Sequence, residues 1–122
     1  MTITETFNGD VVVLELKGNL MGDPETTELR EKIRSLVADG FLKVVLDIAK
    51  LKWVNSSGLG ALISSLATVN NGGGDMRIAN VTEKINSLFM ITQLIKVFKS
   101  FDSVDRAVAS FMVDPPAGKP VE

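Results

Sequence analysis

The 122-residue sequence contains no cysteine, no histidine and no tyrosine. Without cysteine there is no disulfide, no thiolate metal ligand, no iron–sulfur cluster and no thiol nucleophile. Without histidine the chain lacks the commonest general base and the commonest zinc ligand. An enzyme would have to work with Asp, Glu, Lys and Ser, so the composition favours a binding protein. It predicts no catalytic residue, no metal site and no cofactor.

The sequence also lacks long apolar runs and any cluster of basic residues. Its formal net charge is −2, and no basic face is visible that would attract nucleic acid. The longest apolar stretches are too short and too interrupted to cross a bilayer. Residues 1–10 do not combine a positive region with an apolar one, so no secretory signal is predicted. We expect a cytoplasmic protein that neither binds nucleic acid nor inserts into a membrane.

Apolar periodicity and turn residues predict nine elements in the order β-β-α-β-α-β-α-β-α. The expected strands are 2–7, 10–17, 41–48, 76–79 and 96–101, and the expected helices begin near Asp23, Ser56, Thr82 and Asp102. This order predicts a single α/β domain over residues 1–112, with a mixed, mostly parallel sheet covered by about four helices. Residues 113–122 hold three prolines and are expected to form a disordered tail.

Several finer expectations follow from the same patterns. Residues 18–22 and 49–55 are predicted to be a connector and a loop. Asp23 is predicted to cap a helix that has Pro24 at its first position. Leu46, Leu62 and Ile63 are expected to be buried. The loops after parallel strands meet along one edge of such a sheet, where sites are common.

The most informative segment is 53–60, which reads Trp-Val-Asn-Ser-Ser-Gly-Leu-Gly. It lies where a loop gives way to a helix, and a helix start offers unpaired N–H groups that favour an anion. Ser56 can therefore be a plain N-cap or an acceptor for phosphate. The glycines Gly58 and Gly60 permit either close packing on the sheet or room for a partner. Trp53 is more often an anchor than an interaction hot spot.

This segment resembles the signature of the STAS domain in bacterial anti-sigma factor antagonists. The resemblance also includes Gly18-Asn19-Leu20, the strand 44–48 and the Gly-rich turn that leads to residues 76–80. It implies that an anti-sigma factor serine kinase phosphorylates Ser56 and that a serine phosphatase reverses this. The unphosphorylated form would hold the anti-sigma factor and free the sigma factor, thereby regulating transcription. The resemblance and its neighbourhood give these candidate partner-binding residues: Met21, Asp23, Asn55, Ser57, Gly58 and Leu59.

Two positions depart from the family pattern. Asn55 replaces the usual Asp before the serines, and Met21 replaces an acidic residue after the early strand. Asp23 lies two positions later and either substitutes for that acidic residue or caps the helix. Because Asn and Asp are comparable N-caps, Asn55→Asp is expected to change stability by only a few tenths of a kcal/mol.

Two alternatives remain open at this point. The chain could be a STAS module of another regulatory or transporter-associated complex, without sigma-factor control. It could also be a small enzyme that uses Ser56 as a nucleophile. The enzyme is disfavoured because no histidine exists to activate the hydroxyl and no Gly-x-Ser-x-Gly elbow is present.

Overall fold

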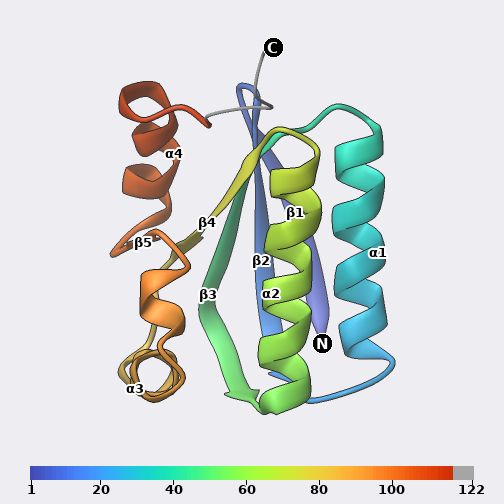
Figure 1. The fold of residues 1–122 in the computed structure, drawn as a ribbon, viewed down its shortest axis with the longest axis vertical. Helices are drawn as coiled ribbons and strands as arrows, with labels where there is room; N and C mark the ends of the chain where they lie inside the picture. The colour runs from blue at the N-terminus through green and yellow to red at the C-terminus, as the bar shows by residue number, and fades with distance from the viewer. Residues whose placement is uncertain (117–122) are drawn as a thin grey trace.

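The structure, a computed structural model, describes residues 1–116 of the chain. Its centre is a five-stranded sheet whose strands lie in chain order. The strands are β1 (Thr2–Asn8), β2 (Val11–Leu20), β3 (Lys43–Val54), β4 (Asp75–Ala79) and β5 (Ser100–Phe101). The helices are α1 (Glu25–Ala38), α2 (Ser56–Asn71), α3 (Glu83–Ile91) and α4 (Val104–Val113), with a short 3-10 helix, η1 (Leu94–Lys96). Figure 1 shows α1 and α2 side by side and α4 apart from them.

Two apolar clusters hold the helices on opposite faces of the sheet. β1 is antiparallel to β2, and the other neighbouring strands are parallel. Because successive residues of a strand point to opposite faces, the strands contribute alternately to the two clusters. The larger cluster, with α1, α2 and α3, includes Val12, Leu14, Leu16, Val44, Leu46 and Ile48. The smaller one, with α4, includes Val11, Val13, Val45 and Ala79. The predicted α/β fold with a mixed, mostly parallel sheet and four helices is confirmed.

β3 is longer than the sequence predicted. Residues 49–54, expected to be a loop, continue the strand and pair with the end of β2, where Leu20 lies opposite Val54. The register shifts twice along this part of the pair, and Leu51 is the one side chain of 49–54 buried in the core. A bulged strand with many exposed positions has little apolar alternation, so its sequence is similar to that of a loop.

The last strand is shorter than predicted. Of residues 96–101, only Ser100 and Phe101 pair with β4, and Lys96 ends the 3-10 helix. Phe98 lies between these elements and stacks on Phe89 of α3, with the ring centroids 5.7 Å apart. The apolar residues of this segment therefore serve packing from a loop rather than strand pairing.

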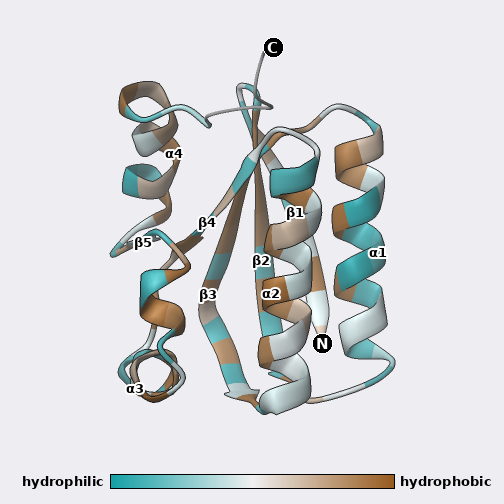
Figure 2. Cartoon of the chain, in the orientation of Figure 1, coloured by the Kyte–Doolittle hydropathy of each residue, from teal (hydrophilic) through white to brown (hydrophobic). Residues whose placement is uncertain are grey.

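α2 buries the predicted stripe except for Ile63. Leu62 faces the core as expected, and Leu66 is also buried, but Ile63 is 41% exposed. The stripe extends instead to the small residues Ala61 and Ser65, which are buried. α2 is covered by the sheet and also by α1 beside it, which moves its buried arc away from Ile63. Figure 2 shows α2 mostly white and brown next to the more hydrophilic α1, and α2 has no charged residue.

α1 begins one residue later than predicted. Pro24 occupies the cap position and Glu25 is the first helical residue. Asp23 still binds the first turn, because its Oδ1 accepts the Thr27 N–H at 3.2 Å and the hydroxyls of Thr26 and Thr27 at 2.7 and 2.5 Å. The assigned first residue of a helix commonly varies by one or two residues, so this difference is small.

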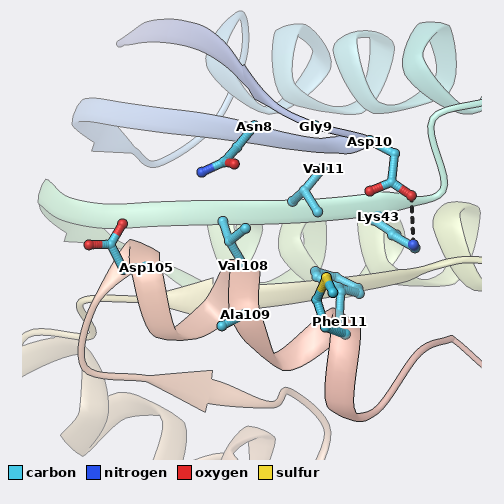
Figure 3. Close-up of a pocket in the computed structure, with 10 residues that line it drawn as sticks. Asn8, Gly9, Asp10, Val11, Lys43, Asp105, Val108, Ala109 and Phe111 are labelled. Carbon is cyan, nitrogen blue, oxygen red and sulfur yellow. Dashed lines mark hydrogen bonds and ion pairs between the residues drawn. The ribbon is translucent and has the colours of Figure 1, made fainter.

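α4 covers the second face of the sheet and leaves a pocket of about 370 Å³ against the β1–β2 turn (Figure 3). The helix includes Val113, and the Lys99 Nζ lies 2.7 Å from Asp114 Oδ2. That hydrogen bond holds the pKa of the Asp114 carboxyl below its usual range. α4 therefore reaches one residue into the segment expected to be a tail, and the tail itself stays a prediction. Residues 117–122 lie outside the described part of the chain.

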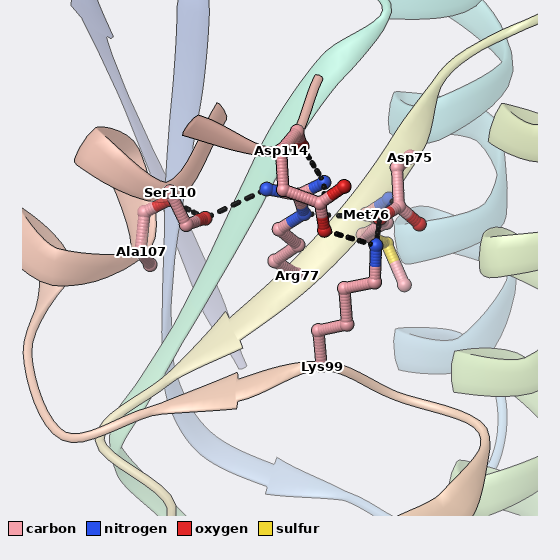
Figure 4. Close-up of polar contacts among 7 residues, drawn as sticks. All are labelled: Asp75, Met76, Arg77, Lys99, Ala107, Ser110 and Asp114. Carbon is pink, nitrogen blue, oxygen red and sulfur yellow. Dashed lines mark hydrogen bonds and ion pairs between the residues drawn. The ribbon is translucent and has the colours of Figure 1, made fainter. Parts of the chain in front are cut away.

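Arg77 of β4 forms hydrogen bonds with the end of α4 (Figure 4). Its side chain is fully buried. Nε donates to Asp75 Oδ2 at 3.0 Å, one terminal nitrogen donates to the Ser110 hydroxyl at 2.8 Å, and the other donates to the Asp114 carbonyl. The guanidinium carbon lies 4.0 Å from the centre of the Phe111 ring. No periodic pattern in the sequence indicated this contact.

Candidate functional site

The candidate site lies where β2 and β3 end side by side. Leu20 and Val54 are opposite each other in the last register position of this parallel pair. The chain leaves β2 through Met21, and it leaves β3 through Asn55 into α2. We call this edge of the sheet the Ser56 end. It is the lower end of the molecule in Figure 1.

Asn55 is the N-cap of α2 and connects the two chain segments. Its Oδ1 accepts the Gly58 N–H at 2.9 Å, as expected of a cap. Its Nδ2 donates to the Met21 carbonyl at 2.6 Å. One amide side chain thus satisfies a helix N–H and fixes the loop after β2. The two positions that depart from the family pattern are therefore bonded to each other.

Ser56 and Ser57 form the first turn of α2 and are both exposed. Within residues 1–116, neither backbone N–H has a hydrogen-bond acceptor. Unpaired N–H groups and the positive end of the helix dipole are what an anion requires. The geometry at Ser56 therefore suits a phosphate carried on its own hydroxyl.

Gly58 and Leu59, both expected to contact a partner, are buried and present no side chain to solvent, so their part in partner binding stays a prediction. Leu59 is 9% exposed and belongs to the large core cluster. Gly58 is buried, and a Cβ at this position would lie 2.0 Å from the Leu20 carbonyl oxygen. Close packing is thus the role of Gly58. A Cβ at Gly60 would meet nothing within 4 Å, so Gly60 leaves open space beside the serines.

Asp23 lies exposed at the start of the loop that leads into α1. The hydroxyls of Thr27 and Thr26 hydrogen-bond its carboxylate and hold its pKa below the ordinary value. The side chain therefore carries a negative charge at neutral pH and also binds the first turn of α1. Both expected roles of Asp23, a cap and an acidic surface group, are compatible with this position.

Exposed apolar side chains accompany the serines. Met21 is 47% exposed and Trp53 is 52% exposed. Lys84 of α3 places its Nζ 2.9 Å from the centre of the Trp53 ring, a cation–π contact. Exposed aromatic and methionine side chains are enriched at protein interfaces. The sequence did not indicate the hydrogen bond between Asn55 and Met21, because the two residues are 34 positions apart. It also did not indicate the contact of Lys84 with Trp53, which was expected to be an anchor.

The sequence matches the profile of the STAS domain family over residues 2–107. The chain belongs to the STAS domain family. The match includes the sheet, α1, α2, α3 and the start of α4, so the residues of the Ser56 end all lie inside this STAS domain.

Named relatives resemble this STAS domain at low identity. The anti-sigma F factor antagonist of Paenibacillus polymyxa is 24% identical over 106 residues, 84% of this chain and 88% of that protein. An anti-sigma-B factor antagonist of Staphylococcus aureus is 28% identical over 67 residues, 55% of this chain and 62% of that protein, which is less than two thirds of its length. The Bacillus cell fate determinant SpoIIAA in its phosphorylated form has 17% identity and a TM-score of 0.71, covering 89% of this chain and 98% of its own.

The contact between Asn55 and Met21 changes what is expected of Asn55→Asp in this STAS domain. The carboxylate could still cap α2, but it could not donate to the Met21 carbonyl. We now expect a loss of about 1 kcal/mol in the free energy of unfolding, the size of one hydrogen bond, rather than a few tenths. Chemical denaturation of wild type and variant measures this. An unchanged midpoint would show that the Met21 contact adds nothing to stability.

Proposed function

We propose that this STAS domain is an anti-sigma factor antagonist that is switched by phosphorylation of Ser56. In this proposal the unphosphorylated domain binds an anti-sigma factor serine kinase in the cytoplasm and frees the sigma factor. A serine phosphatase would restore the binding form. The accessible Ser56 at the start of α2, inside the family signature, is the observation that carries the proposal.

The fold is compatible with a phosphate on Ser56. Phosphorylation adds about −1.5 to −2 charges at neutral pH, together with acceptor oxygens. Those oxygens can take the unpaired N–H groups of the first turn, and the helix dipole favours the charge. Neither Ser56 nor Ser57 is packed against the core, so no buried contact has to break. We therefore expect the modified domain to remain folded.

The phosphate is expected to weaken the binding of a partner. The surface beside Ser56 holds exposed Met21 and Trp53 and the open space at Gly60. A partner that packs on this surface would have to desolvate the phosphate, and burying an unpaired charge is costly. Binding should therefore weaken while stability barely changes. This is the behaviour of a switchable binding protein and requires no catalytic residue on this chain.

Mapping the phosphate tests the assignment of Ser56. Wild type, Ser56→Ala and Ser57→Ala are incubated with the anti-sigma factor kinase of the same organism and ATP, and mass spectrometry locates the modification. We expect phosphate on wild type and on Ser57→Ala, and none on Ser56→Ala. Phosphate on Ser57 alone, or equal labelling of Ser56→Ala, would overturn the assignment.

Calorimetry with the same kinase tests the direction of the switch. Ser56→Asp should weaken binding about tenfold, or about 1.4 kcal/mol, because it adds one charge at the interface. Its free energy of unfolding should stay within about 0.5 kcal/mol of wild type. Ala67→Asp, which adds the same charge at an exposed position farther along α2, is the matched control. Equal weakening by both variants would mean that the site is not centred on Ser56.

A further inference from the structure

A second site of a different kind lies at the opposite end of the sheet from Ser56. The pocket of about 370 Å³ opens between α4 and the β1–β2 turn. This volume lies within the range of small-molecule sites. None of its lining residues belongs to the Ser56 end, so whatever it binds would not compete directly with a partner there.

The middle of the pocket is apolar and comes from two elements that are far apart in the chain. Val11 of β2 faces Val108 and Phe111 of α4 across it (Figure 3). Met112, which also lines the pocket, is 87% exposed. Its unbranched side chain adapts readily to a bound apolar group. These side chains can receive a short aliphatic or aromatic body.

The charged groups of the pocket are unbalanced. Lys43 Nζ lies 2.6 Å from Asp10 Oδ2, and this contact holds the pKa of the Asp10 carboxyl below its usual range. That pair is electrically neutral. The carboxylate of Asp105, at the start of α4, lines the other end of the pocket, which Asn8 lines from β1 (Figure 3). Asp105 has no cation within 4.0 Å among residues 1–116. One carboxylate thus faces the pocket without a countercharge.

We propose that this pocket binds a small amphipathic amine. The apolar body would lie between Val11, Val108 and Phe111, and the ammonium group would pair with Asp105 and donate to the Asn8 side-chain oxygen. The Asp10–Lys43 pair closes the far end without attracting or repelling the ligand strongly. An anionic ligand of the same shape would meet the unpaired carboxylate and be disfavoured.

Asp105 also stabilises the start of α4, and the experiment must distinguish this role from ligand binding. It lies in the first turn of α4, where a carboxylate complements the helix dipole. Asp102 is a suitable control because it lies near the same helix start, pairs with Arg106 at 3.5 Å and does not line the pocket. If Asp105 acted only on the helix, Asp105→Asn and Asp102→Asn would have similar, small consequences.

Titration with 2-phenylethylammonium, followed by the NMR signals of the Met112 and Val108 methyl groups, tests the proposal. We expect a dissociation constant of about 1 mM or tighter, a normal value for so small a ligand. Asp105→Asn should weaken binding about threefold, or about 0.6 kcal/mol, since Asp105 is exposed and solvent screens its ion pair. Asp102→Asn should leave it unchanged. Ala109→Trp, at an exposed lining position, should block it by filling the pocket.

The uncharged analogue 2-phenylethanol and the anion 3-phenylpropionate complete the test. Both should bind at least about threefold more weakly than the ammonium. Equal binding of the alcohol, no effect of Asp105→Asn, or shifts that persist in Ala109→Trp would overturn the proposal. Phosphorylation of Ser56 is not involved in any of these measurements, so their outcome is independent of the proposed function.

Discussion

Replacing Gly58 by alanine is expected to lower the free energy of unfolding by about 3 kcal/mol, the upper part of the range for overpacking. The new Cβ would lie 2.0 Å from the Leu20 carbonyl oxygen and 2.9 Å from Val54 Cγ1. The carbonyl belongs to the backbone of β2 and cannot rotate away. The start of α2 would therefore have to move off the sheet, which also disturbs the cap at Asn55. Urea denaturation followed by circular dichroism measures the change.

Gly60→Ala is the matched control for this prediction. The two glycines are two residues apart on α2, but the added Cβ at Gly60 meets nothing within 4 Å. Alanine is favoured over glycine inside a helix by about 1 kcal/mol, so this variant should be equal to or more stable than wild type. A loss below about 1 kcal/mol for Gly58→Ala would show that the helix start adapts and that close packing is not the role of Gly58.

Arg77→Ala is expected to destabilise the domain by about 3–5 kcal/mol, the size found when one partner of a buried charged network is removed. The variant would lose three side-chain hydrogen bonds, the contact with Phe111 and the volume of a fully buried side chain. Asp114 is 62% exposed, so its ion pair adds little, and most of the loss comes from packing and hydrogen bonds. Thermal unfolding measures the total effect.

The region that loses stability first distinguishes Arg77 from other core residues. Because Arg77 bonds Ser110 and Asp114, amide hydrogen exchange should rise first in α4. Arg77→Met, which keeps much of the apolar volume, should cost less than Arg77→Ala. Arg34→Ala on the exposed face of α1 should stay within about 0.5 kcal/mol. Arg77→Ala with stability near that of Arg34→Ala would contradict the role assigned to this contact.

The sequence correctly predicted the features of the fold that depend on the pattern of apolar residues. The strand around Val44–Ile48 and the burial of Leu46 and Leu62 were predicted correctly, because burial on a sheet or a helix face repeats at a fixed period. The same reasoning failed for Ile63, whose surroundings depend on how α1 lies beside α2. It also failed for residues 49–54, where strand pairing survives without an apolar alternation.

Polar contacts between distant segments could not be predicted from the sequence. Asn55 and Met21 are 34 residues apart, and Arg77 and Asp114 are 37 residues apart. Neither pair leaves a periodic signal, since the first depends on which strand ends are neighbours in the sheet and the second on where α4 ends against β4. The serine signature did locate the candidate site, but it did not tell which of its members face solvent. The structure separates exposed Ser56 and Ser57 from buried Gly58 and Leu59.

The absence of cysteine has a practical consequence when it is combined with the course of α4. Val113 is 87% exposed and ends α4 far from Ser56, whereas Met1 lies at the same end of the sheet as Ser56 (Figure 1). Val113→Cys would give the chain its single thiol, to which a fluorophore can be attached without labelling any other position. Such a label would report a bound partner through slower tumbling and leave the Ser56 end unobstructed, which a tag fused at Met1 would not.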